Sequence, residues 1–197
     1  MKKLHIEDLV HFDFMDPPAP ETLMRALELL NQLGALDDEG ELTTEGAIIA
    51  EFPLDPMLAK TLLYASKMQV MQPVLSIVSI LNSPPIFLRP KDKAKDADAV
   101  KMKFAHLDGD HLTYLTAYNT YLRQENTKEW CFENFVNPRA MKITDDVRGQ
   151  LNDMMVKRDI GSHSLSPGDP NLNRNIKKSL LAGYFSQVAH LEKAGHY

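Results

Sequence analysis

Proline placement is the feature that most restricts how this chain of 197 residues can fold. Proline donates no amide hydrogen and breaks a helix interior, so its clusters predict the boundaries between elements. Twelve prolines occur, and many gather at residues 17–20, 83–85 and 89–90. None lies between Lys91 and Asn137, which suits long helices. The pattern predicts a mainly α chain whose helices are separated by short breaks.

The first 66 residues have the outline of a winged-helix module, with helices around a small β-hairpin. Glu21–Leu33 carries a wide apolar arc, which predicts a largely buried helix that ends before Gly34. Residues 36–42 surround an acidic turn and predict the hairpin, and Thr43 or Thr44 can cap a short helix after it. A short amphipathic helix is also expected at the start of the chain, from Leu4, Ile6, Leu9, Val10 and Phe12.

Residues 67–197 predict a helical bundle. Just before them, Asp55 is a plausible N-cap, with Pro56 at the first helical position. Pro73–Leu81 is almost uniformly apolar and predicts a central core helix. Further helical segments are expected at 91–106, 111–124, 138–158 and 176–191, with a loop at 161–173.

Charge is divided unevenly along the chain. Residues 1–60 carry 4 Lys/Arg against 13 Asp/Glu, whereas the remaining residues carry 18 against 14. A polyanion is therefore expected to meet the second part, and a protein partner is the better expectation for the first. No run of apolar residues is long enough for a membrane span. The single cysteine, Cys131, excludes an internal disulfide and favours a reducing compartment.

No motif for catalysis stands out. The chain has no Gly-x-x-x-x-Gly-Lys-Ser/Thr loop and no Gly-x-Gly-x-x-Gly or Gly-x-Ser-x-Gly sequence. Residues 106–111 (HLDGDH) could ligate a divalent metal, which keeps a small metal-dependent hydrolase open as an alternative. His106 and His111 are five residues apart rather than four, so the favoured interpretation is a helix break with Asp110 as the next N-cap.

Two polar stretches are candidates for contact with a ligand. Residues 89–103 are basic but interleaved with aspartates, which favours a solvated helix face. Residues 130–139 place three aromatics beside polar groups at the expected start of a helix, where free amide N–H groups can meet a phosphate. Arg139 and Lys142 lie three apart on one side, while Arg148 falls on the opposite side. Cys131 is expected to be a buried packing residue.

Five short motifs in a fixed order resemble the region that follows the motor in DEAH-box RNA helicases. The motifs are Phe14-Met15-Asp16-Pro17-Pro18, Leu42-Thr43-Thr44-Glu45-Gly46, Ala50-Glu51-Phe52-Pro53-Leu54-Asp55-Pro56, Gly109-Asp110-His111-Leu112-Thr113 and Trp130-Cys131-Phe132-Glu133-Asn134-Phe135. The resemblance extends over about the whole chain and is strongest to members that act in spliceosome disassembly and ribosome maturation. It implies a winged-helix domain at 1–66 and a helicase-associated ratchet domain at 67–197.

The resemblance also implies a role without catalysis in this region. Such a region walls a single-stranded RNA channel, and the matching candidates here are Asn134, Arg139, Lys142 and the Gly109-Asp110-His111 break. It docks glycine-rich (G-patch) activator proteins, for which the candidates are Met24, Leu27 and Leu36, although core packing is the stronger expectation for these three.

The wider context implied by the resemblance is a larger enzyme. The chain resembles part of an ATP-dependent helicase whose RecA-like motor domains and OB-like module are not in this sequence. No cofactor is expected in this region, since ATP and magnesium belong to the motor. Implied partners are spliceosomal or pre-ribosomal particles, and the implied compartment is the nucleus, with the cytoplasm as a further one. A free-standing winged-helix regulator of nucleic acid is the alternative, against which the acidic first 60 residues argue.

Overall fold

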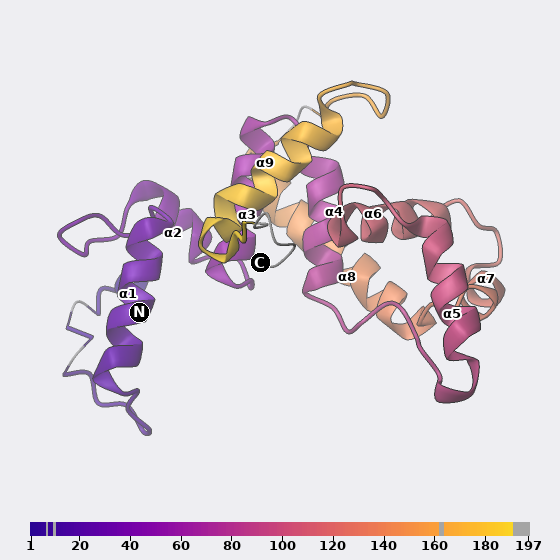
Figure 1. Cartoon of the computed structure of the whole chain (residues 1–197). Helices are drawn as coiled ribbons and strands as arrows, with labels where there is room; N and C mark the ends of the chain where they lie inside the picture. The colour runs from indigo at the N-terminus through magenta and orange to yellow at the C-terminus, as the bar shows by residue number, and fades with distance from the viewer. Residues whose placement is uncertain (7, 10, 162–163, 191–197) are drawn as a thin grey trace. The chain divides into compact units, whose positions relative to one another are not determined.

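The computed structural model describes residues 1–6, 8, 9, 11–161 and 164–190, and within them the chain is mainly helical (Figure 1). The α-helices are α1 (Pro20–Gln32), α2 (Thr44–Ile49), α3 (Pro56–Lys67), α4 (Met71–Leu81), α5 (Ala94–Lys101), α6 (Asp110–Tyr121), α7 (Thr127–Glu133), α8 (Pro138–Lys157) and α9 (Leu172–Tyr184). Short 3-10 turns are η1 (Lys2–Leu4), η2 (Lys91–Lys93), η3 (Met102–Phe104) and η4 (Phe185–Gln187). The predicted mainly α class is confirmed.

The chain forms two compact units. The first comprises residues 1–64 together with the described residues from Lys177 onward, and the second comprises Ala65–Ile176. The predicted domains, 1–66 and 67–197, remain a prediction. In the part of the chain that the structure describes, no helix combines the length and apolarity needed to cross a bilayer.

Local signals determine several element ends in the first unit. Gly34 has φ 71° and ends α1 in a Schellman motif, with Gly34 N–H donating to Asn31 C=O (2.7 Å) and Ala35 N–H to Leu30 C=O (2.8 Å). Thr43 caps α2 by accepting from the Gly46 amide at 2.9 Å. These two termini were expected from the sequence and are confirmed.

The predicted hairpin is reduced to one pair of residues. Leu36 and Leu42 form an isolated antiparallel bridge around the acidic turn. Asp37 organises this turn, because its carboxylate accepts from the amides of Glu39 (3.1 Å) and Glu41 (2.7 Å).

Two expectations for the first unit were wrong. The described part of the opening segment is not an amphipathic helix: within residues 1–6, 8, 9, 11 and 12 only Lys2–Leu4 is helical, as a 3-10 turn, and Val10 lies outside the described residues. The helix predicted at 21–33 exists as α1, but none of its residues is buried, and Leu33 beyond its end is the first buried position. A wide apolar arc shows that a helix can bury a face, but not that neighbours cover it.

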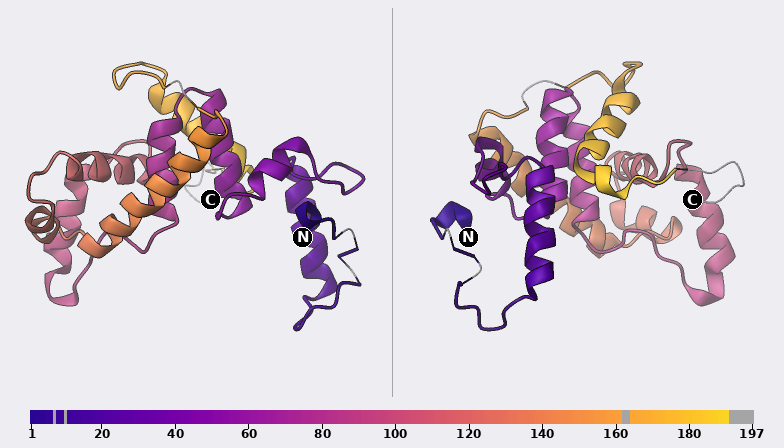
Figure 2. Two further views of the ribbon diagram at one scale, coloured as in Figure 1. Left: turned by 180° about the vertical axis from the view of Figure 1, so that it is seen from behind. Right: turned by 60° about the vertical axis from the view of Figure 1, so that its left-hand side comes forward.

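The second unit is built on α4. All residues from Val74 to Ile80 are buried, as predicted for a central core helix. Helices α6 and α8 both pack against it, and α8 runs beside α4 in the left view of Figure 2. The buried Ser79 hydroxyl donates to Leu75 C=O at 2.8 Å, so this polar atom stays satisfied inside the core.

Polar side chains join the helices of the second unit. The Asp145 carboxylate of α8 accepts from the hydroxyls of Tyr118 (2.6 Å) and Tyr121 (3.2 Å) of α6. Burial is the main cause that raises the pKa of both tyrosines, and the Asp145 carboxylate adds to it. One turn further along α8, Arg148 donates to the Ser76 hydroxyl (3.0 Å) and to Gln72 Oε1 (2.5 Å) of α4.

The start of α6 and the extent of α9 differ from expectation. Gly109, with φ 105°, is the N-cap of α6, so Asp110 is the first helical residue and its side chain makes no cap bond. The left-handed turn that glycine accepts places the helix boundary one residue earlier. The last helix begins at Leu172 rather than 176 and ends at Tyr184, followed by a 3-10 turn, while residue 191 lies outside the described residues.

Gly46 gives a sharp test of packing in the first unit. A Cβ at this buried position would collide with the backbone of Ala35, and backbone cannot move aside cheaply. We expect Gly46→Ala to lower the free energy of unfolding by about 3 kcal/mol. Gly149→Ala is the matched control: nothing lies within 4 Å of its Cβ position in α8, so it should stabilise by about 0.8 kcal/mol. Urea unfolding measures both, and equal stability of the two variants would contradict the assigned contact.

Candidate functional site

Two of the candidate RNA residues lie on the exposed side of α8 near its start. Arg139 and Lys142 are both exposed and three residues apart, so their side chains leave the same side of the helix. Neither makes an ion pair or side-chain hydrogen bond within the described residues. Two exposed cationic side chains are therefore available to a phosphate backbone.

The backbone of this turn does not offer the free amides expected from the sequence. Asn137 caps α8, and its side-chain oxygen accepts from the amides of Arg139 (3.1 Å) and Ala140 (3.3 Å). The Met141 amide donates to Asn137 C=O at 3.0 Å, and Pro138 has no amide hydrogen. Any anion here is held by side chains. This cap was not predicted, although Asn137 directly before Pro138 is a sequence signal for it.

An extended pairing holds the start of α8 in place. Asn137 N–H donates to Ile86 C=O and Leu88 N–H donates to Phe135 C=O, both at 2.8 Å. Phe87 and Val136 form the antiparallel bridge between these bonds. The chain just before α8 is thereby tied to the segment that follows α4.

Asn134 is less available than its neighbours. It is the C-cap of α7, and its side-chain amide donates to Trp130 C=O at 2.9 Å. The residue is half-buried, which leaves only its side-chain oxygen for a ligand.

The three residues of the Gly109-Asp110-His111 break form a second group at the start of α6. Gly109 and Asp110 are exposed, and the Asp110 carboxylate lies 3.9 Å from the Lys101 ammonium. His111 is half-buried, and its burial lowers the pKa of the ring, although the Asp110 carboxylate opposes this shift. A histidine with a lowered pKa is neutral at pH 7 and adds no positive charge to this face.

The structure bears on the metal alternative through His106. Its Nδ1 lies 3.1 Å from the Asp108 amide and its Nε2 lies 3.3 Å from the Asn173 side-chain amide. Both ring nitrogens thus have protein partners. Within the described residues, no three His, Cys, Asp or Glu side chains gather as a metal site would need.

The aromatic cluster at 130–135 is divided between core and surface. Trp130 is half-buried, and its ring lies 5.8 Å from that of Phe104 and 6.1 Å from that of Tyr121. Phe132 is 67% exposed. Cys131 between them is buried as predicted, and burial raises the pKa of its thiol to about 11.

The three docking candidates occupy different environments. Met24 is 61% exposed, Leu27 is half-buried and Leu36 is buried at the bridge to Leu42. Because Leu36 is buried, only Met24 and Leu27 of the three candidates offer apolar area to a partner protein.

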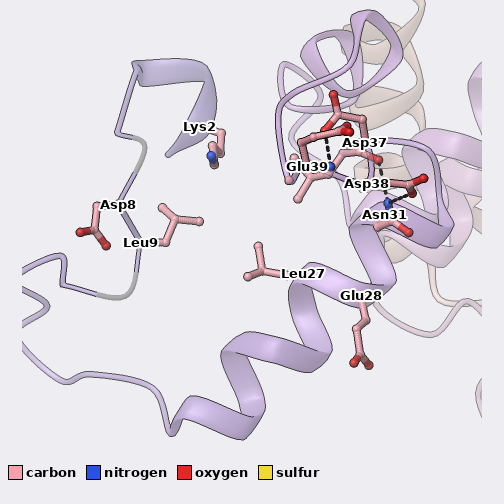
Figure 3. A pocket seen from close by; sticks show the side chains of 11 residues that line it. Lys2, Asp8, Leu9, Leu27, Glu28, Asn31, Asp37, Asp38 and Glu39 are labelled. Carbon is pink, nitrogen blue, oxygen red and sulfur yellow. Dashed lines mark hydrogen bonds between the residues drawn. The ribbon is translucent and has the colours of Figure 1, made fainter.

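Leu27 and Leu36 line two adjoining cavities in the first unit. The first, of about 450 Å³, places Leu9 and Leu27 on opposite sides and acidic residues of the 37–39 turn at one end (Figure 3). The second, of about 360 Å³, is lined mainly by apolar residues, among them Leu30, Ile49 and Phe52. An apolar floor with an acidic rim is the chemistry that a basic amphipathic helix matches.

The burial of His111 predicts a pH dependence of stability. Because its folded-state pKa lies below the unfolded value of 6.5, the unfolded chain gains a proton first as the pH falls, and folding stability decreases below about pH 6.5. His111→Gln removes this contribution, so its melting temperature should decrease less than that of the unsubstituted chain between about pH 7.5 and 5.5. Thermal unfolding by circular dichroism measures the difference, and parallel curves would refute it.

Comparison with protein-family models agrees with the order of elements described above. Residues 26–54 match the model of the helicase-associated domain (HA2), winged-helix, which spans the end of α1, the Leu36–Leu42 bridge and α2. Residues 55–114 match the model of the helicase-associated domain (HA2), ratchet-like, from α3 into α6. The two matches adjoin, so residues 26–114 are similar, in this order, to the winged-helix and ratchet-like parts of a helicase-associated region.

Proposed function

We propose that this chain is the accessory region of an ATP-dependent DEAH-box RNA helicase, in which it walls the single-stranded RNA channel and docks protein activators. The observation that carries the proposal is the pair of adjoining helicase-associated matches, winged-helix first and ratchet-like second. The region itself has no catalytic role in this proposal.

RNA contact belongs to the second unit in this proposal. The exposed Arg139 and Lys142 supply charge from one side of α8, and the cap by Asn137 holds their helix turn in a defined position. With few cations and no free amides on that turn, the contact is weak guidance of the phosphate backbone rather than tight binding. Asn134 and the Gly109-Asp110-His111 break add shape and polar atoms.

Activator docking belongs to the first unit. Its acidic residues around the 37–39 turn disfavour RNA and favour a basic partner. The apolar area at Met24 and Leu27 is the contact surface for a helix of a glycine-rich (G-patch) activator.

The complete enzyme in this proposal hydrolyses ATP with magnesium in RecA-like motor domains and carries an OB-like module. Its cellular role is in pre-mRNA splicing, at spliceosome disassembly, and in ribosome biogenesis. The proposed compartment is the nucleus, including the nucleolus, with the cytoplasm as a further site.

Reversing the charge on α8 tests the RNA channel. In a helicase chain carrying this region, Arg139→Glu together with Lys142→Glu should weaken binding of oligo-uridine about fivefold and reduce RNA-stimulated ATP hydrolysis. The slope of log affinity against log salt should decrease by about 0.7 for each phosphate that the variant no longer neutralises. Fluorescence anisotropy and a coupled ATPase assay measure these quantities.

Lys157→Glu is the matched control for that pair. It is exposed on the same helix, about 27 Å along the axis from Arg139, and should leave RNA affinity unchanged. Unchanged affinity and salt slope in the Arg139/Lys142 variant would remove these residues from the channel.

A charge on the docking surface tests the activator site. Met24→Asp should weaken binding of a G-patch protein about tenfold, because an interface centre tolerates no unpaired carboxylate. The high exposure of Met24 argues against unfolding as the cause of such an effect. Leu181→Asp, at a comparably exposed position of α9, is the control. Equal effects of both variants in a pull-down titration would place the activator elsewhere.

A further inference from the structure

The extended segment between α4 and α5 uses only one of its two backbone edges. Ile86 C=O and Leu88 N–H point toward residues 135–137 and bond to them, and Phe87 faces Val136 between those bonds. In an antiparallel pair, neighbouring residues direct their backbone groups to opposite sides. The N–H and C=O of Phe87 therefore point away from residues 135–137.

This second edge is unpaired. Among the residues that the structure describes, no hydrogen bond joins the Phe87 N–H or C=O, the Arg89 N–H or the Pro85 C=O to any partner. Pro85 and Pro90 have no amide hydrogen, so they limit the edge to two donors. The open edge therefore presents two acceptors, the C=O groups of Pro85 and Phe87, and two donors, the N–H groups of Phe87 and Arg89.

A cavity of about 290 Å³ adjoins this segment. Residues 85–89 line it, and Ala97, Asp98 and Lys101 of α5, together with Tyr114 of α6, complete its wall. A single extended chain needs this kind of space beside an open edge.

The charges around the cavity are placed asymmetrically. The Arg89 guanidinium forms two bonds with the Asp98 carboxylate, at 2.8 and 2.9 Å, so these two charges neutralise each other. The Lys101 ammonium lies 3.9 Å from the Asp110 carboxylate, its one ion pair among the described residues, and 5.4 Å from the centre of the Phe87 ring. Lys101 is thus the cation of this wall with the most capacity for a new partner.

We propose that this edge docks an extended peptide of a partner protein by strand addition, with an acidic side chain of that peptide at Lys101. The peptide backbone supplies the donors and acceptors that Phe87 and Arg89 lack, and the cavity receives its side chains. The proposal concerns a protein ligand and does not depend on the RNA channel.

The chemistry of the edge favours a peptide over RNA. A phosphodiester backbone only accepts hydrogen bonds, whereas this row also presents the C=O groups of Pro85 and Phe87. A second copy of this chain is a poor occupant, because the flanking prolines shorten the edge and oppose edge-to-edge pairing.

Amide exchange tests the open edge in the free chain. By NMR, the amide protons of Phe87 and Arg89 should exchange much faster than the bonded amides of Leu88 and Asn137. Equal protection of all four would show that the edge is already paired and would overturn the proposal.

Binding is tested with a short acetylated peptide of alternating valine and glutamate as the probe. It should slow exchange of the Phe87 and Arg89 amides and shift their resonances. Lys101→Glu should weaken binding of the peptide about fivefold, whereas the exposed Lys103→Glu should not. Melting temperatures of both variants check that the fold is retained.

Three controls make the binding test decisive. A backbone N-methylated version of the peptide should not bind, nor should the valine–lysine peptide of opposite charge. Oligo-uridine should leave the Phe87 and Arg89 amides unaffected. No binding of the valine–glutamate peptide, equal binding of its N-methylated form, or protection of the same amides by oligo-uridine would each overturn the proposal.

Discussion

The burial of α4 is the constraint on which the second unit depends. A helix with seven consecutive buried residues, Val74 to Ile80, exists in water only when other helices cover it on every side. Helices α6 and α8 provide much of that cover, and the bonds from Arg148 to Ser76 and Gln72 define how α8 lies along it. The polar face of α8 that remains exposed is a consequence of this packing.

Further contacts around α8 determine which groups on its exposed face are available to a ligand. The tyrosine pair of α6 holds Asp145, and the pairing of residues 86–88 with 135–137 holds the chain that enters α8. Between these supports, the Asn137 cap uses the amides that a phosphate would otherwise meet. The proposed RNA contact therefore depends on the side chains of Arg139 and Lys142. The proposed peptide-binding edge is the side of residues 85–89 that faces away from residues 135–137.

Signals carried by one or two adjacent residues were predicted well. Gly34, Thr43 and the Asp55-Pro56 pair mark helix ends as expected, because capping depends on local geometry and nearby amides. Predictions that needed a neighbour were wrong more often. No residue of the apolar arc of α1 is buried, and among the described opening residues only a 3-10 turn forms. One local prediction was also wrong, because Gly109 rather than Asp110 caps α6. Docking candidates of similar hydropathy, such as Met24 and Leu36, differ completely in exposure.

The sequence by itself determined the helical class, several helix boundaries, the acidic character of the first 60 residues and the core identity of the 73–81 segment. Each follows from periodicity, capping or charge, which act over a few residues. The tertiary structure alone decided which amides are free, that His111 is half-buried with a lowered pKa, and which backbone edge is left open. Those properties depend on residues far apart in the chain, such as Ile86 and Asn137, whose distance in space no local pattern encodes.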